Sequence, residues 1–194
     1  MSPPNLREQR RSSTRREIAA AALDLVLERG LAEVTVEDIA KAAGISPRTF
    51  FNYFPSKKSA VVAGPEPLSA EAIEVFVADR DTPVLDGLRT LLMSCDLVVS
   101  DKRVLINRIH QVVVAHPELV PVLHEQLMEF EAVLTDAVAR RLGVPAHDER
   151  PVVAAAVASA LLRVTMSKQT AETDEPIEIE LGQVFDALRA LAAT

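Results

Sequence analysis

The chain has 194 residues, a formal net charge of −7, and 48% hydrophobic against 25% charged residues, which is typical of a folded globular protein and not of a disordered one. Abundant Ala and Leu, punctuated by 12 Pro and 6 Gly, predict an all-α fold. The longest charge-free apolar run, residues 152–162, is shorter than the ~20 residues that span a bilayer, and the N-terminus has no apolar signal core. We therefore expect a cytoplasmic protein with no membrane partner. Its single cysteine, Cys95, excludes an internal disulfide.

Charge is unevenly distributed along the sequence. Residues 1–58 contain ten Lys and Arg against seven Asp and Glu, whereas the rest of the chain contains eleven against twenty-one. Five arginines precede the first periodic apolar stretch with only one acidic residue among them: Arg7, Arg10, Arg11, Arg15 and Arg16. We interpret residues 1–13 as a basic, flexible arm that approaches phosphates, with a solubilising tail as the alternative.

Two helices are predicted after this arm. Apolar side chains recur at helical spacing over residues 14–29, and Gly30 follows as a stop signal. Thr35 and Asp38 have the spacing of a capping box, which opens a second, short helix ending before Gly44. Both helices can therefore bury one apolar face against a neighbour.

A third helix follows a turn at residues 43–46. Ser46 has the character of an N-cap, and Pro47 suits the first helical position because its missing N–H would be unpaired there in any case. Phe50 and Phe54, four residues apart, share a face and are expected to pack on the first two helices. Two short helices joined by a glycine-containing turn form a helix-turn-helix, whose second helix enters the DNA major groove.

The opposite face of this third helix carries side chains that suit DNA recognition. Arg48 can donate twice to a guanine edge, Asn52 can pair with adenine, Thr49 can touch a thymine methyl, and Tyr53 can reach a phosphate. Small helical modules of other kinds have the same layout, so the pattern alone leaves the DNA-binding interpretation open.

Residues 18–57, IAAAALDLVLERGLAEVTVEDIAKAAGISPRTFFNYFPSK, resemble the N-terminal domain of the TetR family of bacterial transcriptional regulators. The matching features are the Ala-Ala pair, the ERG stop, TVEDIAKAAGIS, and a recognition helix that ends in an aromatic residue, Tyr-Phe and Ser-Lys. Arg48 departs from the Gly or Ala often found there in the family, which suggests an individual sequence preference. With the basic arm and the reading face, the resemblance gives these expected DNA contacts: Arg15, Arg16, Thr35, Ser46, Pro47, Arg48, Thr49, Phe51, Asn52, Tyr53 and Lys57.

A second all-helical region follows a break at residues 63–67. Further breaks, at proline-containing segments, leave helices expected at 69–77, 83–99, 102–115, 118–142, 148–168 and 177–193. We therefore divide the chain into a basic arm (1–13), a helix-turn-helix DNA-binding domain (14–62) and a helical ligand-binding and dimerisation domain (63–194). The role of the third part is implied by the TetR resemblance.

The last two predicted helices indicate self-association. The first is rich in small residues that permit close helix approach, and the second carries apolar residues at near-heptad spacing. They can pack within one monomer, or form a two-fold four-helix bundle with a second copy, which would place two recognition helices on a palindromic site. The expected interface residues are Val153, Val157, Leu161, Ile177, Leu181, Val184, Leu188 and Leu191.

The second region carries no pattern typical of catalysis or metal binding. His110 and His124 lie in predicted helices without a ligand partner three or four residues away, and neither a nucleophile–base pair nor a Gly-rich phosphate loop is present. We therefore expect no enzymatic activity, no cofactor and no metal.

In the TetR family this region encloses a mostly apolar cavity, whose small-molecule ligand changes the separation of the two recognition helices. The candidate lining residues combine adaptable apolar surface with polar anchors: Arg89, Met93, Asn107, His110, Met128 and Phe130. The resemblance thus predicts a homodimeric repressor that a small, largely apolar effector releases from a palindromic operator in double-stranded DNA. The end of the chain resembles a subgroup associated with acyl-CoA-like ligands. A helical metal- or redox-responsive sensor and a dimeric adaptor that does not bind DNA are the alternatives.

Overall fold

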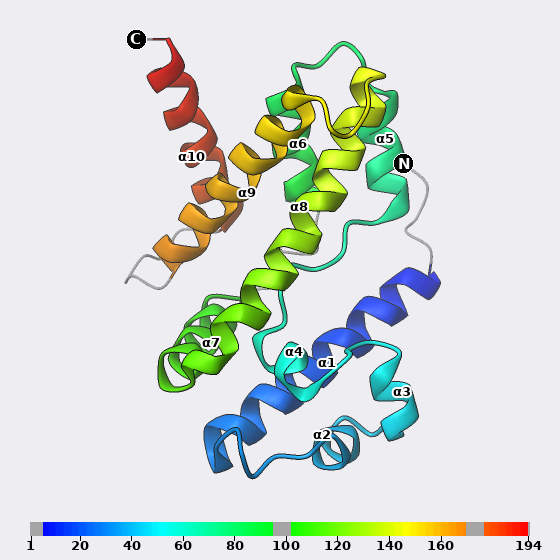
Figure 1. Ribbon diagram of the computed structural model, residues 1–194, viewed down its shortest axis with the longest axis vertical. Coiled ribbons are helices and arrows are strands. Elements are labelled where there is room, and N and C mark those ends of the chain that lie inside the picture. The colour runs from blue at the N-terminus through cyan, green and yellow to red at the C-terminus, as the bar shows by residue number, and fades with distance from the viewer. Residues whose placement is uncertain (1–5, 95–101, 170–176, 194) are drawn as a thin grey trace. The chain divides into compact units, whose positions relative to one another are not determined.

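The computed structural model describes residues 6–94, 102–169 and 177–193, and these residues are helical with no β-strand among them (Figure 1). The all-α prediction is therefore confirmed for the described part of the chain. Cys95, the single cysteine of the chain, lies outside the described residues. The elements in chain order are α1 Leu6–Arg29, α2 Val36–Ala42, α3 Pro47–Phe51, α4 Lys57–Val62, α5 Ala70–Ala78, α6 Val84–Ser94, α7 Lys102–Ala115, η1 Pro117–Leu119, α8 Val120–Leu142, α9 Glu149–Gln169 and α10 Ile177–Ala192.

The chain divides into two compact units. The first comprises Met1–Pro65 with Asn107–Gln126, and the second comprises Glu66–Ile106 with Leu127–Thr194. The end of α7 and the start of α8 therefore belong to the same compact unit as the four N-terminal helices.

In the first unit, α1 packs against α2 and α4, and α2 packs against α3. The apolar stripe of α1 is buried, with Ile18, Leu23 and Val26 at most 3% exposed. This helix begins at Leu6, whereas the sequence predicted a start at residue 14 and a flexible arm before it. The extension has a local cause, because its Arg, Glu and Gln residues are good helix formers and Ser13 donates a hydrogen bond to Glu17 one turn later (2.9 Å).

In the second unit, the core is built from α5, α6, α8, α9 and α10. Its fully buried members include Leu88 and Leu92 of α6, Leu134 of α8, and Leu181 and Phe185 of α10. Small residues of α9 allow this close packing, since Ala155 and Ala158 are 0% exposed.

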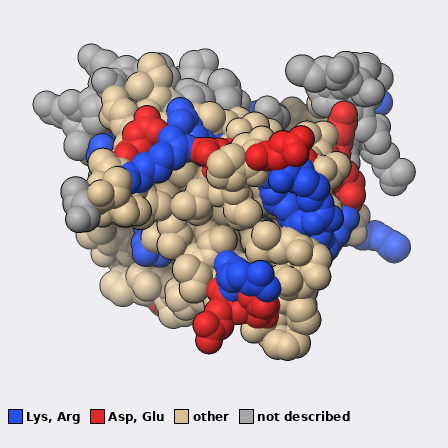
Figure 2. Space-filling view, turned by 90° about the horizontal axis from the view of Figure 1, so that it is seen from above, with Lys and Arg blue, Asp and Glu red and all other residues tan. Residues whose placement is uncertain are grey.

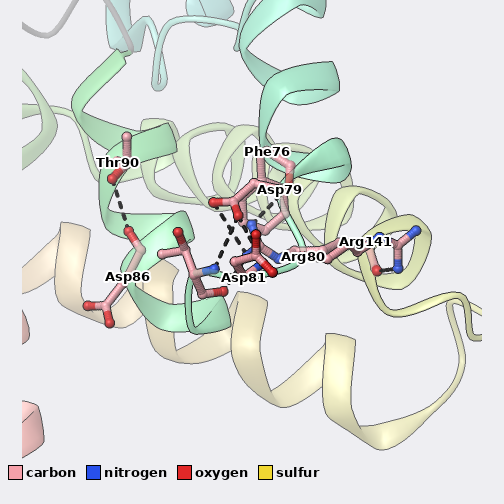
Figure 3. Close-up of polar contacts among 8 residues, drawn as sticks. Phe76, Asp79, Arg80, Asp81, Asp86, Thr90 and Arg141 are labelled. Carbon is pink, nitrogen blue, oxygen red and sulfur yellow. Dashed lines mark hydrogen bonds and ion pairs between the residues drawn. The ribbon is translucent and has the colours of Figure 1, made fainter.

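A buried arginine joins α8 to the turn between α5 and α6 (Figure 3). Arg141, whose side chain is 3% exposed, donates hydrogen bonds to the carbonyls of Phe76 (2.8 Å) and Thr82, and its guanidinium lies 4.6 Å from the Phe76 ring centroid. The neighbouring Asp79 carboxylate accepts from the Thr82 backbone N–H (3.1 Å) and lies 3.7 Å from Arg141. Hydrogen bonds from Thr82 lower the pKa of Asp79. The turn is thus held by charge-assisted bonds, which are stronger than neutral ones.

Ion pairs also link α6 and α10. Arg189 of α10 pairs with Asp86 of α6, and Arg89 of α6 lies 3.6 Å from Asp186 of α10. On the face that Figure 2 shows, groups of Lys and Arg lie beside groups of Asp and Glu. The side chains of the two α6–α10 ion pairs are partly exposed, so these pairs orient the helices more than they stabilise them.

Much of the helix α9 is exposed in the single chain. Over Glu149–Lys168 it is long and apolar enough to cross a membrane by length and composition, and 28% of its most apolar stretch is buried within the chain. Core helices of soluble proteins pass the same test, so the expectation that no segment crosses a membrane stays a prediction.

Candidate DNA-binding surface

The start of α2 is fixed by the capping box that the sequence predicted. The Thr35 hydroxyl accepts a hydrogen bond from the Asp38 backbone N–H (3.1 Å), and the Asp38 carboxylate accepts from the Thr35 backbone N–H (3.0 Å) and hydroxyl (2.6 Å). These bonds stabilise the charged carboxylate and lower the pKa of Asp38. At the other end of α2, Gly44 has φ +68°, a conformation that glycine adopts without strain.

The start of α3 is fixed in the same local way. Ser46 is the N-cap, its hydroxyl oxygen accepts from the Thr49 backbone N–H (3.0 Å), and Pro47 occupies the first turn. The Thr49 and Ser46 hydroxyl oxygens are 2.8 Å apart. Ser46 and Thr49 were both expected to contact DNA, and their hydroxyls take part in the helix cap.

The two faces of the segment Pro47–Phe54 separate as the sequence predicted. Phe50 and Phe54 are 0% and 1% exposed, with ring centroids 6.1 Å apart, and they anchor the segment in the core. Arg48, Phe51 and Asn52 are exposed. A short helix thus presents a guanidinium, a phenyl ring and an amide side by side.

Arg15 holds the end of this helix from α1. Its guanidinium lies 4.3 Å from the Phe54 ring centroid and donates a hydrogen bond to the Tyr53 carbonyl (3.1 Å). Arg16 donates from Nε to the Ser12 carbonyl (3.4 Å) within α1. Arg15 and Arg16 were expected to contact DNA, and the structure gives the Arg15 side chain a positioning contact with the recognition helix segment.

Lys57, another expected DNA contact, bonds the connection between α1 and α2. Its ammonium donates to the carbonyls of Leu31 (2.8 Å) and Val34 (2.7 Å). The Lys57 side chain is half-buried. An ammonium has three N–H donors, and the two carbonyls accept from two of them. One donor remains for a phosphate, so DNA contact by Lys57 stays a prediction.

Sequence reasoning missed the residues that join α4 to α8. Gln126 donates from its amide to the Ser59 carbonyl (3.0 Å) and accepts from the Gly64 backbone N–H. A side chain at Gly64 would meet Gln126 within 2.6 Å, so the approach requires glycine. Arg108 of α7 similarly pairs with Asp24 of α1. These partners are at least 62 residues apart in sequence, and no local pattern signals them.

The six candidate ligand residues are divided between the two compact units. Phe130 belongs to the core of the second unit and Met93 packs against that core, while Met128 is 43% exposed. Arg89 points to α10, where its guanidinium would meet a side chain at position 182 within 2.7 Å. Asn107 and His110 belong to the first compact unit. A separate cavity of about 400 Å³ is lined by Arg80, Asp81, Thr82, Pro83, Val84, Arg141 and Leu142.

The expected dimer residues fall into two groups. Ile177, Leu181 and Val184 are at most 7% exposed within the chain, because α10 packs on α9 and α6, and their place in a dimer interface stays a prediction. Leu161 packs against the same core, and Val157 and Leu188 are half-buried. The large apolar residues left exposed among the described parts of these helices are Val152 (45%), Val153 (59%), Val164 (44%), Ile179 (52%) and Leu191 (74%).

The described residues contain no candidate metal site. No group of three or more His, Cys, Asp or Glu side chains is arranged there to hold a metal ion. The alternative of a metal-responsive sensor therefore has no candidate site among residues 6–94, 102–169 and 177–193.

Comparison with known proteins identifies both parts of the chain. Residues 18–63 match the family described as bacterial regulatory proteins, tetR family, and residues 82–193 match the MftR C-terminal domain. MftR of Mycobacterium tuberculosis, named for the regulation of mycofactocin biosynthesis, is 29% identical over 94% of this chain and 92% of its own. The HTH-type transcriptional regulator TcmR of Streptomyces glaucescens is 30% identical over 96% and 87% respectively. EthR of Mycobacterium tuberculosis is 45% identical over 31% of this chain and 29% of its own.

The N-terminal match covers the capped helices α2 and α3, and the C-terminal match extends from the α5–α6 turn to the end of α10. The chain is therefore a member of the TetR family of DNA-binding transcriptional regulators, a family that is not enzymatic, and its second part is a C-terminal domain of the MftR type.

Proposed function

We propose that this regulator is a cytoplasmic homodimer that represses transcription from a palindromic operator and is released by a small, largely apolar effector. The observation that carries the proposal is the exposed face of α3, with Arg48 and Asn52 side by side and with both ends of the helix fixed. A helix whose two ends are fixed loses little backbone freedom on binding, so its base contacts contribute more to affinity.

Recognition of DNA by one such helix is weak, and this supports a dimer. Two recognition helices held about one DNA turn apart read both halves of a palindrome, and the second contact forms at high effective concentration. The exposed valines of α9 and the exposed Leu191 of α10 supply apolar surface for a second copy.

Selection of duplexes by the full-length protein tests DNA recognition. We expect recovery of an inverted repeat, and we expect Arg48→Ala to abolish the preference at one base position in each half-site, at a cost of ~1–3 kcal/mol for the preferred base. Lys58→Ala is the matched control because it removes a cation from α4, outside the reading face. Equal loss on every sequence from Arg48→Ala would contradict base reading, and failure to bind any selected duplex at low salt would favour the adaptor.

The effector is proposed by class only. A long-chain acyl-CoA thioester should lower DNA affinity and raise Tm, whereas free CoA should do neither, because the acyl chain supplies the apolar surface that a cavity buries. Effects of equal size from CoA and acyl-CoA would exclude an apolar effector site. An effector that binds the DNA-competent state equally well would leave the operator affinity unchanged.

A further inference from the structure

Phe51 is the exposed aromatic ring of the recognition helix. Its side chain is 57% exposed, although the other two phenylalanines of this segment, Phe50 and Phe54, are buried. The ring is held edge to face with Phe50, at 5.5 Å between centroids and an interplanar angle of 88°. A ring fixed in this way presents apolar surface at a defined place beside Arg48 and Asn52.

The chemistry of Phe51 limits what it can recognise. A phenyl ring has no hydrogen-bond donor or acceptor, so it cannot bond a phosphate or the polar edge of a base. Within the major groove, the apolar group presented by base pairs is the C5 methyl of thymine. Thr49, to which the sequence pattern assigned the thymine methyl, is half-buried, and its hydroxyl contacts Ser46 in the helix cap.

We propose that Phe51 reads a thymine by packing its ring against the C5 methyl, and that it is a specificity-determining residue of this regulator. The inference rests on the proposed DNA-binding function and adds the identity of one base to it. Phe51 follows Arg48 by three residues, so the two side chains share a face of α3.

The helix geometry also gives the register. Three residues advance about 4.5 Å along an α-helix, and successive base pairs are about 3.4 Å apart. The thymine therefore lies one or two base pairs from the base that Arg48 contacts, which makes the two preferences neighbours in the half-site.

A methyl-deletion experiment on the unmodified protein tests the proposal. Each thymine of a selected duplex is replaced in turn by deoxyuridine, which removes the C5 methyl and leaves the base-pairing edge intact. At one position per half-site we expect about a fourfold rise in Kd, which corresponds to the ~0.8 kcal/mol of one buried methyl-sized group. The other thymines of the half-site serve as internal controls.

Variants of Phe51 complete the test. Phe51→Ala should bind the thymine and deoxyuridine duplexes equally, so that the fourfold difference disappears, while Lys58→Ala should retain it. Phe51→Leu, which keeps an apolar side chain, should preserve part of the difference. Because Phe51 is exposed, we expect the Tm of both variants to stay close to that of the parent protein, and deoxyuridine scanning of the parent protein does not depend on them.

The outcomes separate this inference from the function on which it rests. If no duplex is recovered, the proposed DNA-binding function fails. If a duplex is recovered but no thymine responds to methyl removal, the Phe51 proposal is overturned. A uniform loss of affinity in Phe51→Ala on all duplexes, with the deoxyuridine difference retained, would instead assign the ring to the sugar-phosphate backbone and overturn thymine reading.

Discussion

The ammonium of Lys57 lies between two carbonyls of the α1–α2 connection. Charge-assisted hydrogen bonds are stronger than neutral ones, and removing the ammonium leaves the half-buried carbonyls of Leu31 and Val34 without this donor. We expect Lys57→Ala to lower the free energy of unfolding by about 1–3 kcal/mol in urea denaturation. Lys58→Ala, which removes the same charge from the next position, should change it by less than ~0.5 kcal/mol. Equal losses in the two variants would show that Lys57 acts only through its charge.

Asp38 makes the stability of α2 depend on pH. Its folded-state pKa is lowered by the hydrogen bonds from Thr35, so the carboxylate stabilises the fold above the ordinary pKa of an aspartate, about 3.9, and this contribution is lost as the pH falls through the lower, folded-state value. We therefore expect Asp38→Asn to lower Tm at pH 7 and the difference from the parent protein to shrink below pH ~4. Glu37→Gln, in the same first turn, is the charge-matched control. A difference that is constant between pH 7 and pH 3 would contradict the capping role of the carboxylate.

At these positions, prediction from sequence works where the interaction is local. The sequence predicts Thr35 and Ser46 as caps because the signals are close together in the chain: Asp38 follows Thr35 by three residues, and Pro47 follows Ser46 directly. The partners of Arg15 and Lys57 are 38 and at least 23 residues away. Their basic side chains indicated phosphates, because a sequence does not show that a carbonyl or a phenyl ring lies within reach.

Substitution by alanine should affect the free energy of unfolding differently at two helical glycines, Gly87 of α6 and Gly182 of α10. Replacing an interior helical glycine by alanine normally stabilises by up to ~1 kcal/mol. In α6, however, a Cβ at Gly87 would lie 2.6 Å from Nη1 of the buried Arg141 and 2.9 Å from the Phe76 ring. In α10, a Cβ at Gly182 would meet Nη2 of Arg89 at 2.7 Å, and that side chain is 32% exposed and can move.

We therefore expect Gly87→Ala to lower the free energy of unfolding by about 1–3 kcal/mol, because neither neighbour can move without breaking the α5–α6 turn. Gly182→Ala should leave it unchanged or raise it by up to ~1 kcal/mol. Urea denaturation of both variants measures the two values under one set of conditions. Stabilisation by Gly87→Ala would mean that Arg141 does not hold the turn in place.

Helix limits were largely readable from proline and glycine. The expected helix at 102–115 coincides with α7, and the one at 177–193 differs from α10 by one residue. The faces of α10 were harder to predict, because the repeat of Ile177, Leu181 and Val184 fits a partner subunit and the chain's own α6 and α9 equally well. Periodicity shows that a face is buried, and it does not show against which chain.

The net charge of −7 does not describe the surface that meets DNA. The excess of acidic residues lies after residue 58, whereas the recognition helix and its supports lie before it.

The break in the helical pattern of the sequence places a domain boundary near residue 63, and that boundary stays a prediction. The compact first unit also includes Asn107–Gln126, which is joined to it through Arg108 and Gln126. Such long-range pairings depend on the folded chain and have no local signature.

For the whole molecule, the decisive prediction concerns the exposed side of α9. Val153 and Val164 are eleven residues apart, which is three helical turns, so they lie on one stripe, and they are 59% and 44% exposed. Exposed apolar surface of this kind marks an interaction site, and we propose that a second copy of the chain covers it. We therefore expect the chain to be a dimer in sedimentation analysis and Val153→Asp to convert it to a monomer.

Loss of the dimer should also weaken operator binding, since the second half-site contact would no longer form at high effective concentration, and avidity of this kind amounts to ~100-fold or more. Val75→Asp is the matched control, because Val75 of α5 is 66% exposed and lies outside α9 and α10. It should leave both the sedimentation coefficient and the Kd unchanged. A monomeric parent protein at micromolar concentration, or transfer of the parent protein to lipid vesicles, would refute the proposal that a second copy covers α9, because the stripe would then be exposed or in contact with lipid.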